Sequence, residues 1–168
     1  MIKKLANFIF LFLLCSCGPS ISDTNGRDYK DYEEFQISNI EDFYLQEEDE
    51  YLVEIYFPEC PHCTNIKGNI FDYLDNYKNN KVSKKLYLFN IKSGSSEEGR
   101  TNREKFKKKP SNSFDENQAK IWLNQNLNEK PNKIEDTYFF YVPSLYQIKN
   151  GVLDYVTWGE NNVINYLN

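Results

Sequence analysis

Two apolar runs, with a helical pattern between them, are the clearest feature of the first half of the chain. Residues 52–57 and 85–91 are short and rich in aliphatic and aromatic side chains, which predicts buried strands. Between them, residues 61–78 carry apolar side chains at helical spacing, namely Cys63, Ile66, Ile70, Leu74 and Tyr77. This order predicts two parallel strands joined by a helix.

The C-terminal end of the chain predicts a hairpin followed by a short helix. Residues 144–149 and 152–157 have the character of strands, and the Asn150-Gly151 pair between them is typical of a two-residue turn. Gly159 precedes the segment that we expect to form the last helix. Near the other end, residues 35–37 are expected to form a short first strand.

Two capping-box patterns predict further helices. Ser38-Asn-Ile-Glu41 starts one that extends to about residue 48, and Ser113-Phe-Asp-Glu116 starts another. The second helix has an apolar stripe and ends before Pro131; the stripe consists of Ala119, Trp122, Leu123 and Leu127. Residues 93–112 are predicted to form a solvated loop whose lysines are balanced by nearby acids, the alternative being a patch for a membrane or a nucleic acid. Residues 93–137 are therefore expected to be partly helical.

The N-terminus has the features of a targeting segment. A basic start at Lys3 and Lys4 and a short apolar core at residues 8–14 predict a signal peptide over residues 1–16. Leu14-Cys15-Ser16-Cys17 resembles the lipobox of bacterial lipoproteins, which makes Cys17 the expected lipidation site. A plain signal peptide or an uncleaved anchor remains the alternative. Residues 17–34 are polar and are predicted to be a flexible tether to a domain at 35–168.

Charge and cysteine content narrow the function further. The chain has a net charge of −5, and loss of residues 1–16 leaves 18 basic and 25 acidic residues, a net charge of −7. Such a surface argues against nucleic acid and against electrostatic attachment to anionic lipid. Once Cys17 is acylated, the mature chain keeps Cys60 and Cys63 as its only other cysteines, and export places them where disulfides persist.

These two cysteines belong to a motif, Cys60-Pro61-His62-Cys63, at the predicted change from strand to helix. The positive end of a helix stabilises a thiolate on the first cysteine, and the second can close the ring and release a partner. Zinc uses the same spacing but needs about four ligands, and His62 is the sole histidine of the chain. The motif therefore predicts a redox dithiol without metal or cofactor; a structural disulfide or a metal site is the alternative.

With this motif, the chain resembles the thioredoxin superfamily. Members carry a buried acid six residues before the first cysteine, where Glu54 stands, and a cis-proline facing the dithiol, where Val142-Pro143 fits. The resemblance covers about residues 35–92 and 138–168 and implies a thioredoxin-like α/β fold, with a central mixed sheet of about four to five strands flanked by helices and with residues 93–137 as an insertion before the cis-proline. The Pro-His pair between the cysteines looks like the DsbA type of oxidant.

The resemblance also implies a role for each site residue. Cys60 is the nucleophile and is expected to be exposed, with Cys63 as the shielded resolving thiol. Glu54, partly buried and with a raised pKa, would accept the proton of Cys63; a surface acid at a strand edge is the alternative. His62 would stabilise the Cys60 thiolate, although an exposed polar residue is the alternative, and Pro61 suits the first helical turn.

Val142 and Pro143 complete the predicted site by presenting backbone to a substrate. The predicted function is a thiol-disulfide oxidoreductase, lipid-anchored on the extracytoplasmic face of the cell membrane, with the Pro-His pair favouring an oxidant. Its expected partners are exported proteins with thiols or disulfides and an unidentified redox partner, and no nucleic acid. The alternative is a non-catalytic thioredoxin-fold lipoprotein that serves as a chaperone-like or transport accessory module.

Overall fold

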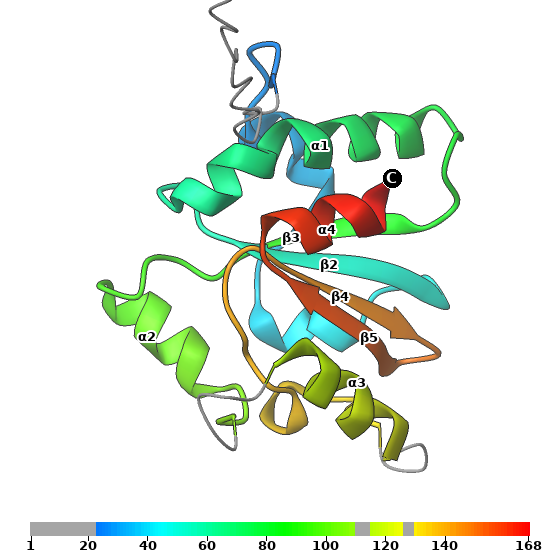
Figure 1. Cartoon of the computed structure of the whole chain (residues 1–168). Helices are drawn as coiled ribbons and strands as arrows, with labels where there is room; N and C mark the ends of the chain where they lie inside the picture. The colour runs from blue at the N-terminus through cyan, green and yellow to red at the C-terminus, as the bar shows by residue number, and fades with distance from the viewer. Residues whose placement is uncertain (1–22, 110–114, 126–129) are drawn as a thin grey trace, which may run out of the picture.

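A five-stranded mixed sheet forms the centre of the molecule (Figure 1). The computed structural model describes residues 23–109, 115–125 and 130–168. The strands are β1 (Gln36–Ile37), β2 (Glu50–Tyr56), β3 (Lys85–Asn90), β4 (Ser144–Lys149) and β5 (Val152–Trp158). The α-helices are α1 (Pro61–Lys78), α2 (Glu97–Glu104), α3 (Glu116–Gln125) and α4 (Glu160–Leu167), and short 3-10 helices span η1 (Tyr29–Phe35), η2 (Ile40–Tyr44) and η3 (Ile134–Asp136).

The strand order is β1-β3-β2-β4-β5. Strands β1, β3 and β2 run parallel, whereas β4 pairs antiparallel with β2 on one side and with β5 on the other. Helix α1 makes the crossover between β2 and β3, and the hairpin of β4 and β5 turns at Asn150 and Gly151, both with positive φ, as a two-residue hairpin turn requires. This topology confirms the thioredoxin-like α/β fold.

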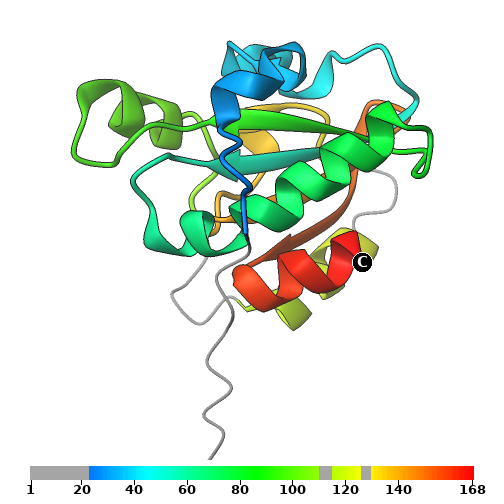
Figure 2. The ribbon, with the colours of Figure 1, turned by 90° about the horizontal axis from the view of Figure 1, so that it is seen from above.

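One face of the sheet, called here the α1 face, is covered by α1, α4 and η1. Figures 1 and 2 show α1 and α4 side by side on this face, and α1 packs on α4. Strand β2 directs Leu52, Glu54 and Tyr56 into this layer, because alternate residues of a strand face the same side. The apolar cluster here includes both cysteines and the buried stripe of α1.

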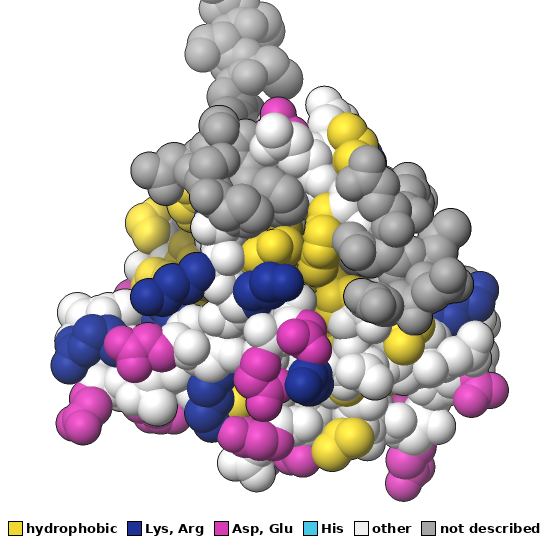
Figure 3. All heavy atoms as spheres, turned by 90° about the horizontal axis from the view of Figure 1, so that it is seen from below, with side chains coloured by type: hydrophobic (Ala, Val, Ile, Leu, Met, Phe, Trp, Pro, Cys, Tyr) yellow, Lys and Arg dark blue, Asp and Glu magenta, His cyan; other side chains and the backbone are white. Residues whose placement is uncertain are grey.

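The other face, called here the aromatic face, is covered by η2, α3 and the segment that leads into β4. Strand β2 contributes Tyr51, Val53 and Ile55, all buried, to a cluster that also holds Tyr44 and Tyr146. Strand β2 is therefore buried on both faces, and this burial fixes the position of its C-terminal end, where the motif begins. On the surface seen from below, basic and acidic side chains are interspersed around apolar ones (Figure 3).

Two predicted segments differ from the structure. The helix expected over residues 38–48 is only η2, and Asn39 precedes it without a side-chain capping bond. A longer helix would place the acidic residues 47–50 at its C-terminus, where negative side chains are unfavourable because this end of a helix carries a partial negative charge. In the structure, Glu48 instead binds Lys85 and Tyr87.

The predicted loop at 93–112 contains helix α2. This helix has no apolar stripe, since Gly99 is its one buried residue, so periodicity could not reveal it. A Cβ on Gly99 would lie 1.9 Å from the Ser93 carbonyl oxygen, so the glycine permits the close contact that holds the helix.

Helix α3 follows a capping box formed by Asp115 and Gln118, whose side chains each accept the backbone N–H of the other residue. The predicted start of the helix, Ser113, precedes this box. Ser113 and Leu127 both lie outside the described residues. Helices α2, α3 and η3 lie between β3 and β4, so the insertion expected at 93–137 is partly helical.

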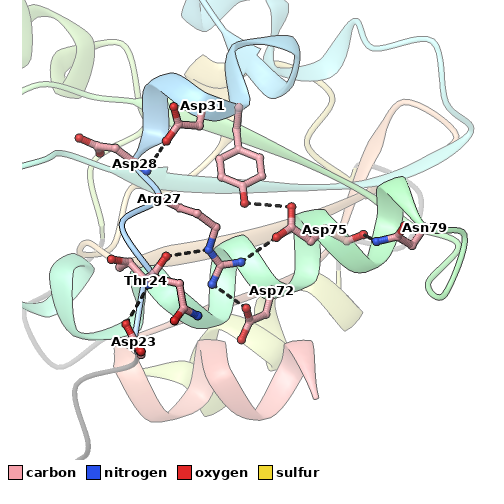
Figure 4. Close-up of polar contacts among 10 residues, drawn as sticks. Asp23, Thr24, Arg27, Asp28, Asp31, Asp72, Asp75 and Asn79 are labelled. Atoms are coloured by element: carbon pink, nitrogen blue, oxygen red, sulfur yellow. Dashed lines mark hydrogen bonds and ion pairs between the residues drawn. The ribbon is translucent and has the colours of Figure 1, made fainter.

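The chain packs on the domain earlier than residue 35. In η1, Tyr29, Tyr32 and Phe35 are buried on the α1 face, where a flexible tether was expected. Arg27 binds Asp72 and Asp75 of α1 at 2.7 Å each (Figure 4). A flexible tether was predicted because these tyrosines are flanked by charged residues, which make the segment polar overall. The contacts of the tyrosines were therefore not expected. Residues 1–16, which are predicted to form a signal peptide, and Cys17 lie outside the described residues. Within the described residues, no helix is long and apolar enough to cross a membrane.

Candidate functional site

The dithiol motif lies where β2 ends and α1 begins. The N–H of Cys60 donates to the Phe57 carbonyl at 3.1 Å, closing a turn, and Cys60 then caps α1 with Pro61 in the first helical position. Cys60 Sγ accepts the backbone N–H of Cys63 at 3.3 Å. Both cysteines are free thiols in this structure. The Cys60 sulfur therefore lies at the N-terminus of α1, where a helix carries a partial positive charge.

Both sulfur-bearing side chains are buried. Cys63 is 1% exposed, as expected, but Cys60 is 3% exposed, so the prediction of an exposed Cys60 is wrong. Val142 and Phe57 pack against the cluster that holds both residues, and Cys60 Sγ lies 3.8 Å from the Val142 carbonyl oxygen. Burial, together with the nearby Glu54 carboxyl, raises the pKa of Cys63. Cys63 therefore needs a proton acceptor before it can attack.

Glu54 lies on the α1 face of β2 and is fully buried, which excludes the alternative of a surface acid. It pairs with Leu88 of β3 and Leu145 of β4, so apolar residues flank it on both sides. Neither carboxyl oxygen has a hydrogen-bond partner. Burial raises the pKa of Glu54 to about 8, which leaves the carboxyl mostly protonated at neutral pH.

Val142 and Pro143 stand directly before β4, and the peptide bond between them is cis. Ser144 pairs with Ile55 of β2, so Pro143 lies beside the end of β2 from which the motif departs. The Pro143 carbonyl accepts the N–H of Gly159 at 2.9 Å. The structure thus brings Val142, which is distant in the sequence, next to Cys60.

The His62 side chain is directed to α4. Its Nδ1 forms a short hydrogen bond with Glu160 Oε1 and not with Cys60, and the ring is 69% exposed. Asn65 Nδ2 donates to the same Glu160 oxygen at 3.1 Å. Glu160, the first residue of α4, therefore binds the first turns of α1 and places a carboxylate next to the motif.

A pocket of about 870 Å³ opens beside the motif and the cis-proline. Tyr141, which precedes Val142, is 59% exposed at this pocket, and Trp158 stacks on Phe140 at 4.0 Å between ring centroids. Its lining consists of His62, Tyr141, Val142, Trp158, Gly159, Glu160, Asn161 and Asn162.

Sequence reasoning missed Tyr141, Trp158 and Glu160. Trp158 and Glu160 flank Gly159, which carries the positive φ of 83° that turns β5 into α4. A glycine between a strand and a helix was the available signal for a pocket wall. The wall also depends on the tertiary contact that brings α4 to the motif.

No cluster of three or more His, Cys, Asp or Glu side chains suited to a metal occurs in residues 23–109, 115–125 and 130–168. What the described residues assemble is a pair of thiols at a helix N-terminus, a buried carboxyl beneath them and an open pocket beside them. This arrangement supports a thiol redox function, because a cysteine pair closes and opens a disulfide by exchange.

No protein-family profile matches this sequence, and no curated protein is similar to it in sequence. Solved structures with a similar course of the chain include one from a study of the thiol resolving mechanism of the yeast mitochondrial 1-Cys peroxiredoxin. It is 9% identical, with a TM-score of 0.40, and the match covers 78% of this chain and 88% of that one. Oxidised mitochondrial thioredoxin 3 of Saccharomyces cerevisiae is 8% identical, with a TM-score of 0.38 and coverage of 79% and 86%.

Proposed function

We propose that this chain is a thiol-disulfide oxidoreductase, anchored by a lipid on Cys17 outside the cytoplasm, that exchanges disulfides with exported proteins. The observation that carries the exchange activity is the position of Cys60 and Cys63 at the N-terminus of α1, above the buried carboxyl of Glu54. The lipid anchor and the extracytoplasmic location are supported by the sequence of residues 1–17 alone.

The oxidising direction agrees with a Glu54 carboxyl that is protonated at rest. A substrate thiolate attacks Cys60 Sγ of the Cys60–Cys63 disulfide, forms a mixed disulfide and releases Cys63 as a thiolate, to which Glu54 gives its proton. A second substrate thiolate then attacks the substrate sulfur of the mixed disulfide, and Cys60 leaves as a thiolate. The substrate gains a disulfide, and the two electrons remain on the reduced pair until a redox partner removes them.

The pocket beside the motif gives the substrate a place to bind. Tyr141 offers an exposed aromatic ring next to the backbone of Val142, and His62 and Glu160 form the polar wall. An extended substrate segment that lies along Val142 would bring its sulfur to Cys60. Replacement of Tyr141 by alanine is therefore expected to weaken substrate capture without changing the reactivity of Cys60 toward small disulfides.

A trapping experiment with the full chain in cells tests this function. The Cys63→Ala variant is expected to accumulate mixed disulfides with exported proteins in the membrane fraction, because nothing resolves the Cys60 adduct. Cys60→Ala is the matched control and should accumulate few. The additional replacement Cys17→Ser should move the adducts out of the membrane fraction if the anchor is a lipid.

The burial of Cys60 favours one alternative, a non-catalytic module whose cysteines only brace the site. In that case the Cys63→Ala variant captures nothing and the wild-type pair stays oxidised in the presence of dithiothreitol. That pair of results would contradict the oxidoreductase proposal, whereas rapid reduction of the wild-type pair would exclude the bracing role.

A further inference from the structure

Tyr29 is placed deep in the redox centre by the segment that precedes the sheet. It begins η1 and is 6% exposed. Its ring stacks on Tyr56 at 3.8 Å between centroids and meets Phe71 of α1 edge-on at 5.3 Å. Asp28, the preceding residue, caps η1 and binds Lys67 of α1 at 2.6 Å. The tyrosine is therefore held both from the sheet and from the helix.

The Tyr29 hydroxyl lies in the same apolar layer as the Glu54 carboxyl. Tyr56, on which the Tyr29 ring stacks, faces the same side of β2 as Glu54, and Cys63 approaches this layer from α1. Among the described residues, five buried side-chain oxygens have no hydrogen-bond partner, and three of them are the Tyr29 hydroxyl and the two Glu54 oxygens.

The same groups interact electrostatically. Burial raises the pKa of Tyr29, and the charges of Glu54, Cys63 and Cys60 raise it further, Glu54 having the largest of these effects. In addition to burial, the Glu54 carboxyl raises the pKa of Cys63 in α1 and of Tyr56 in β2. The Lys67 ammonium lies over the Tyr29 ring, 5.0 Å from its centroid, and is bound to Asp28.

The isolation of this hydroxyl contrasts with the other buried tyrosines. Tyr51 and Tyr146 each donate to a carbonyl at 3.0 Å, and Tyr44 is bonded to Thr137. A phenylalanine at position 29 would make the same ring contacts without burying a polar atom, which costs stability when it has no partner. The ring contacts therefore do not explain why position 29 carries a hydroxyl.

We infer that Tyr29 is a positioning residue for proton transfer, whose O–H donates a hydrogen bond to the Glu54 carboxylate while Glu54 is ionised. This inference rests on the proposed thiol exchange. In resolution, Cys63 gives its proton to the Glu54 carboxylate, attacks Cys60 Sγ and expels the substrate as a thiolate; the Tyr29 proton stays on Tyr29. Neither the Tyr29 hydroxyl nor the Glu54 carboxyl has another hydrogen-bond partner to lose when this bond forms.

The test compares Tyr29→Phe with Tyr32→Phe in the full chain. Both variants lose one hydroxyl from η1, but that of Tyr32 donates to Asp75 at 2.9 Å, away from the redox centre. Reduced protein is mixed with dithionitrobenzoate, and two phases of thiol release are followed from pH 5 to pH 9. The first phase reports attack by Cys60 and the second reports resolution by Cys63.

Tyr29→Phe is expected to slow the second phase about 10-fold at pH 7, the effect of one hydrogen bond to a charged group, and to leave the first phase unchanged. The pH midpoint of the second phase should rise by about one unit. Tyr32→Phe should behave as wild type in both phases. Unchanged second-phase rates and midpoint in Tyr29→Phe would overturn the inference.

A second measurement does not depend on turnover. The protonated carboxyl of Glu54 is followed by infrared spectroscopy against pH, with Glu54→Gln identifying the band, and its midpoint should rise in Tyr29→Phe but not in Tyr32→Phe. An unshifted band overturns the inference even where exchange is normal. Failure of the proposed function has a different signature, namely no first phase in any variant.

Discussion

Several buried polar side chains on the two faces of strand β2 differ in their hydrogen bonding. On the aromatic face, the hydroxyls of Tyr44, Tyr51 and Tyr146 are all hydrogen-bonded inside an apolar layer. On the α1 face, Glu54 and the Tyr29 hydroxyl are equally buried and have no partner. The first arrangement is what stability requires of a core, whereas the second lowers stability.

Burial of Glu54 and of the Tyr29 hydroxyl without partners lowers the stability of the fold near the proposed dithiol site. Tyr29 belongs to the cluster that holds the dithiol, and Glu54 faces the same side of β2; the other unpartnered buried oxygens among the described residues belong to Ser144 and Thr157. Buried ionisable groups with perturbed pKa values gather at functional sites. Replacements of Glu54 or Tyr29 on the α1 face and of Tyr146 on the aromatic face are therefore expected to have different outcomes.

The largest effect is expected from Glu54→Gln. Without a proton acceptor for Cys63, the attack of Cys63 on a Cys60 mixed disulfide should slow about 100-fold at pH 7, while the first attack by Cys60 keeps its rate. The two phases of thiol release after addition of dithionitrobenzoate separate these steps. Tyr146→Phe on the aromatic face is the control and should leave both phases unchanged; a normal second phase in Glu54→Gln would remove Glu54 from the mechanism.

The stability of the wild-type chain should fall as the pH rises from 5 to 8. Glu54 loses its proton near pH 4.5 when unfolded but near pH 8 when folded, so the folded state binds more protons between these values. The free energy of unfolding should decrease by about 3 kcal/mol over this range, as linkage requires. Urea denaturation at several pH values measures the decrease, and in Glu54→Gln this contribution should be absent. A slope that survives in the variant would assign it to other groups.

Removal of a satisfied hydroxyl should cost more than removal of an unsatisfied one. Tyr146→Phe leaves the Tyr138 carbonyl oxygen without its donor at 3.0 Å and should lower the free energy of unfolding by about 1–2 kcal/mol. Tyr29→Phe breaks no hydrogen bond and should leave it equal or higher. Equilibrium unfolding in urea gives both values, and an equal loss in the two variants would mean that Tyr29 has a partner in solution.

The smallest effect is expected at Arg27, which fastens the segment before η1 to α1 (Figure 4). Asp72 and Asp75 are substantially exposed, so Arg27→Ala should lower the free energy of unfolding by no more than about 1 kcal/mol. Hydrogen exchange of η1 amides should nevertheless speed up, while exchange in β2 stays as it is. Lys133→Ala, which removes a solvent-exposed pair with Asp136, is the control and should leave η1 unaffected.

The sequence alone determined the parts of the fold that local patterns encode. Strands β2 and β3, helix α1 and the hairpin of β4 and β5 follow from apolar runs, helical spacing and the Asn150-Gly151 turn. The spacing of Cys60, Cys63 and Glu54 along a strand and a helix likewise fixed which residues could form a dithiol with an acid beneath it.

Tertiary structure decided what depends on contacts between distant segments. Cys60 is buried because it packs near Val142. His62 is bonded to Glu160 because α4 docks beside α1. Tyr29 reaches its position because the segment before the sheet folds back on it, although the tyrosines of this segment are flanked by charged residues. Helix α2 depends on the contact between Gly99 and Ser93 and not on an apolar stripe. Periodicity reports which face of an element is apolar, but not what covers that face, and coverage sets the exposure, the partners and the pKa of the groups in this site.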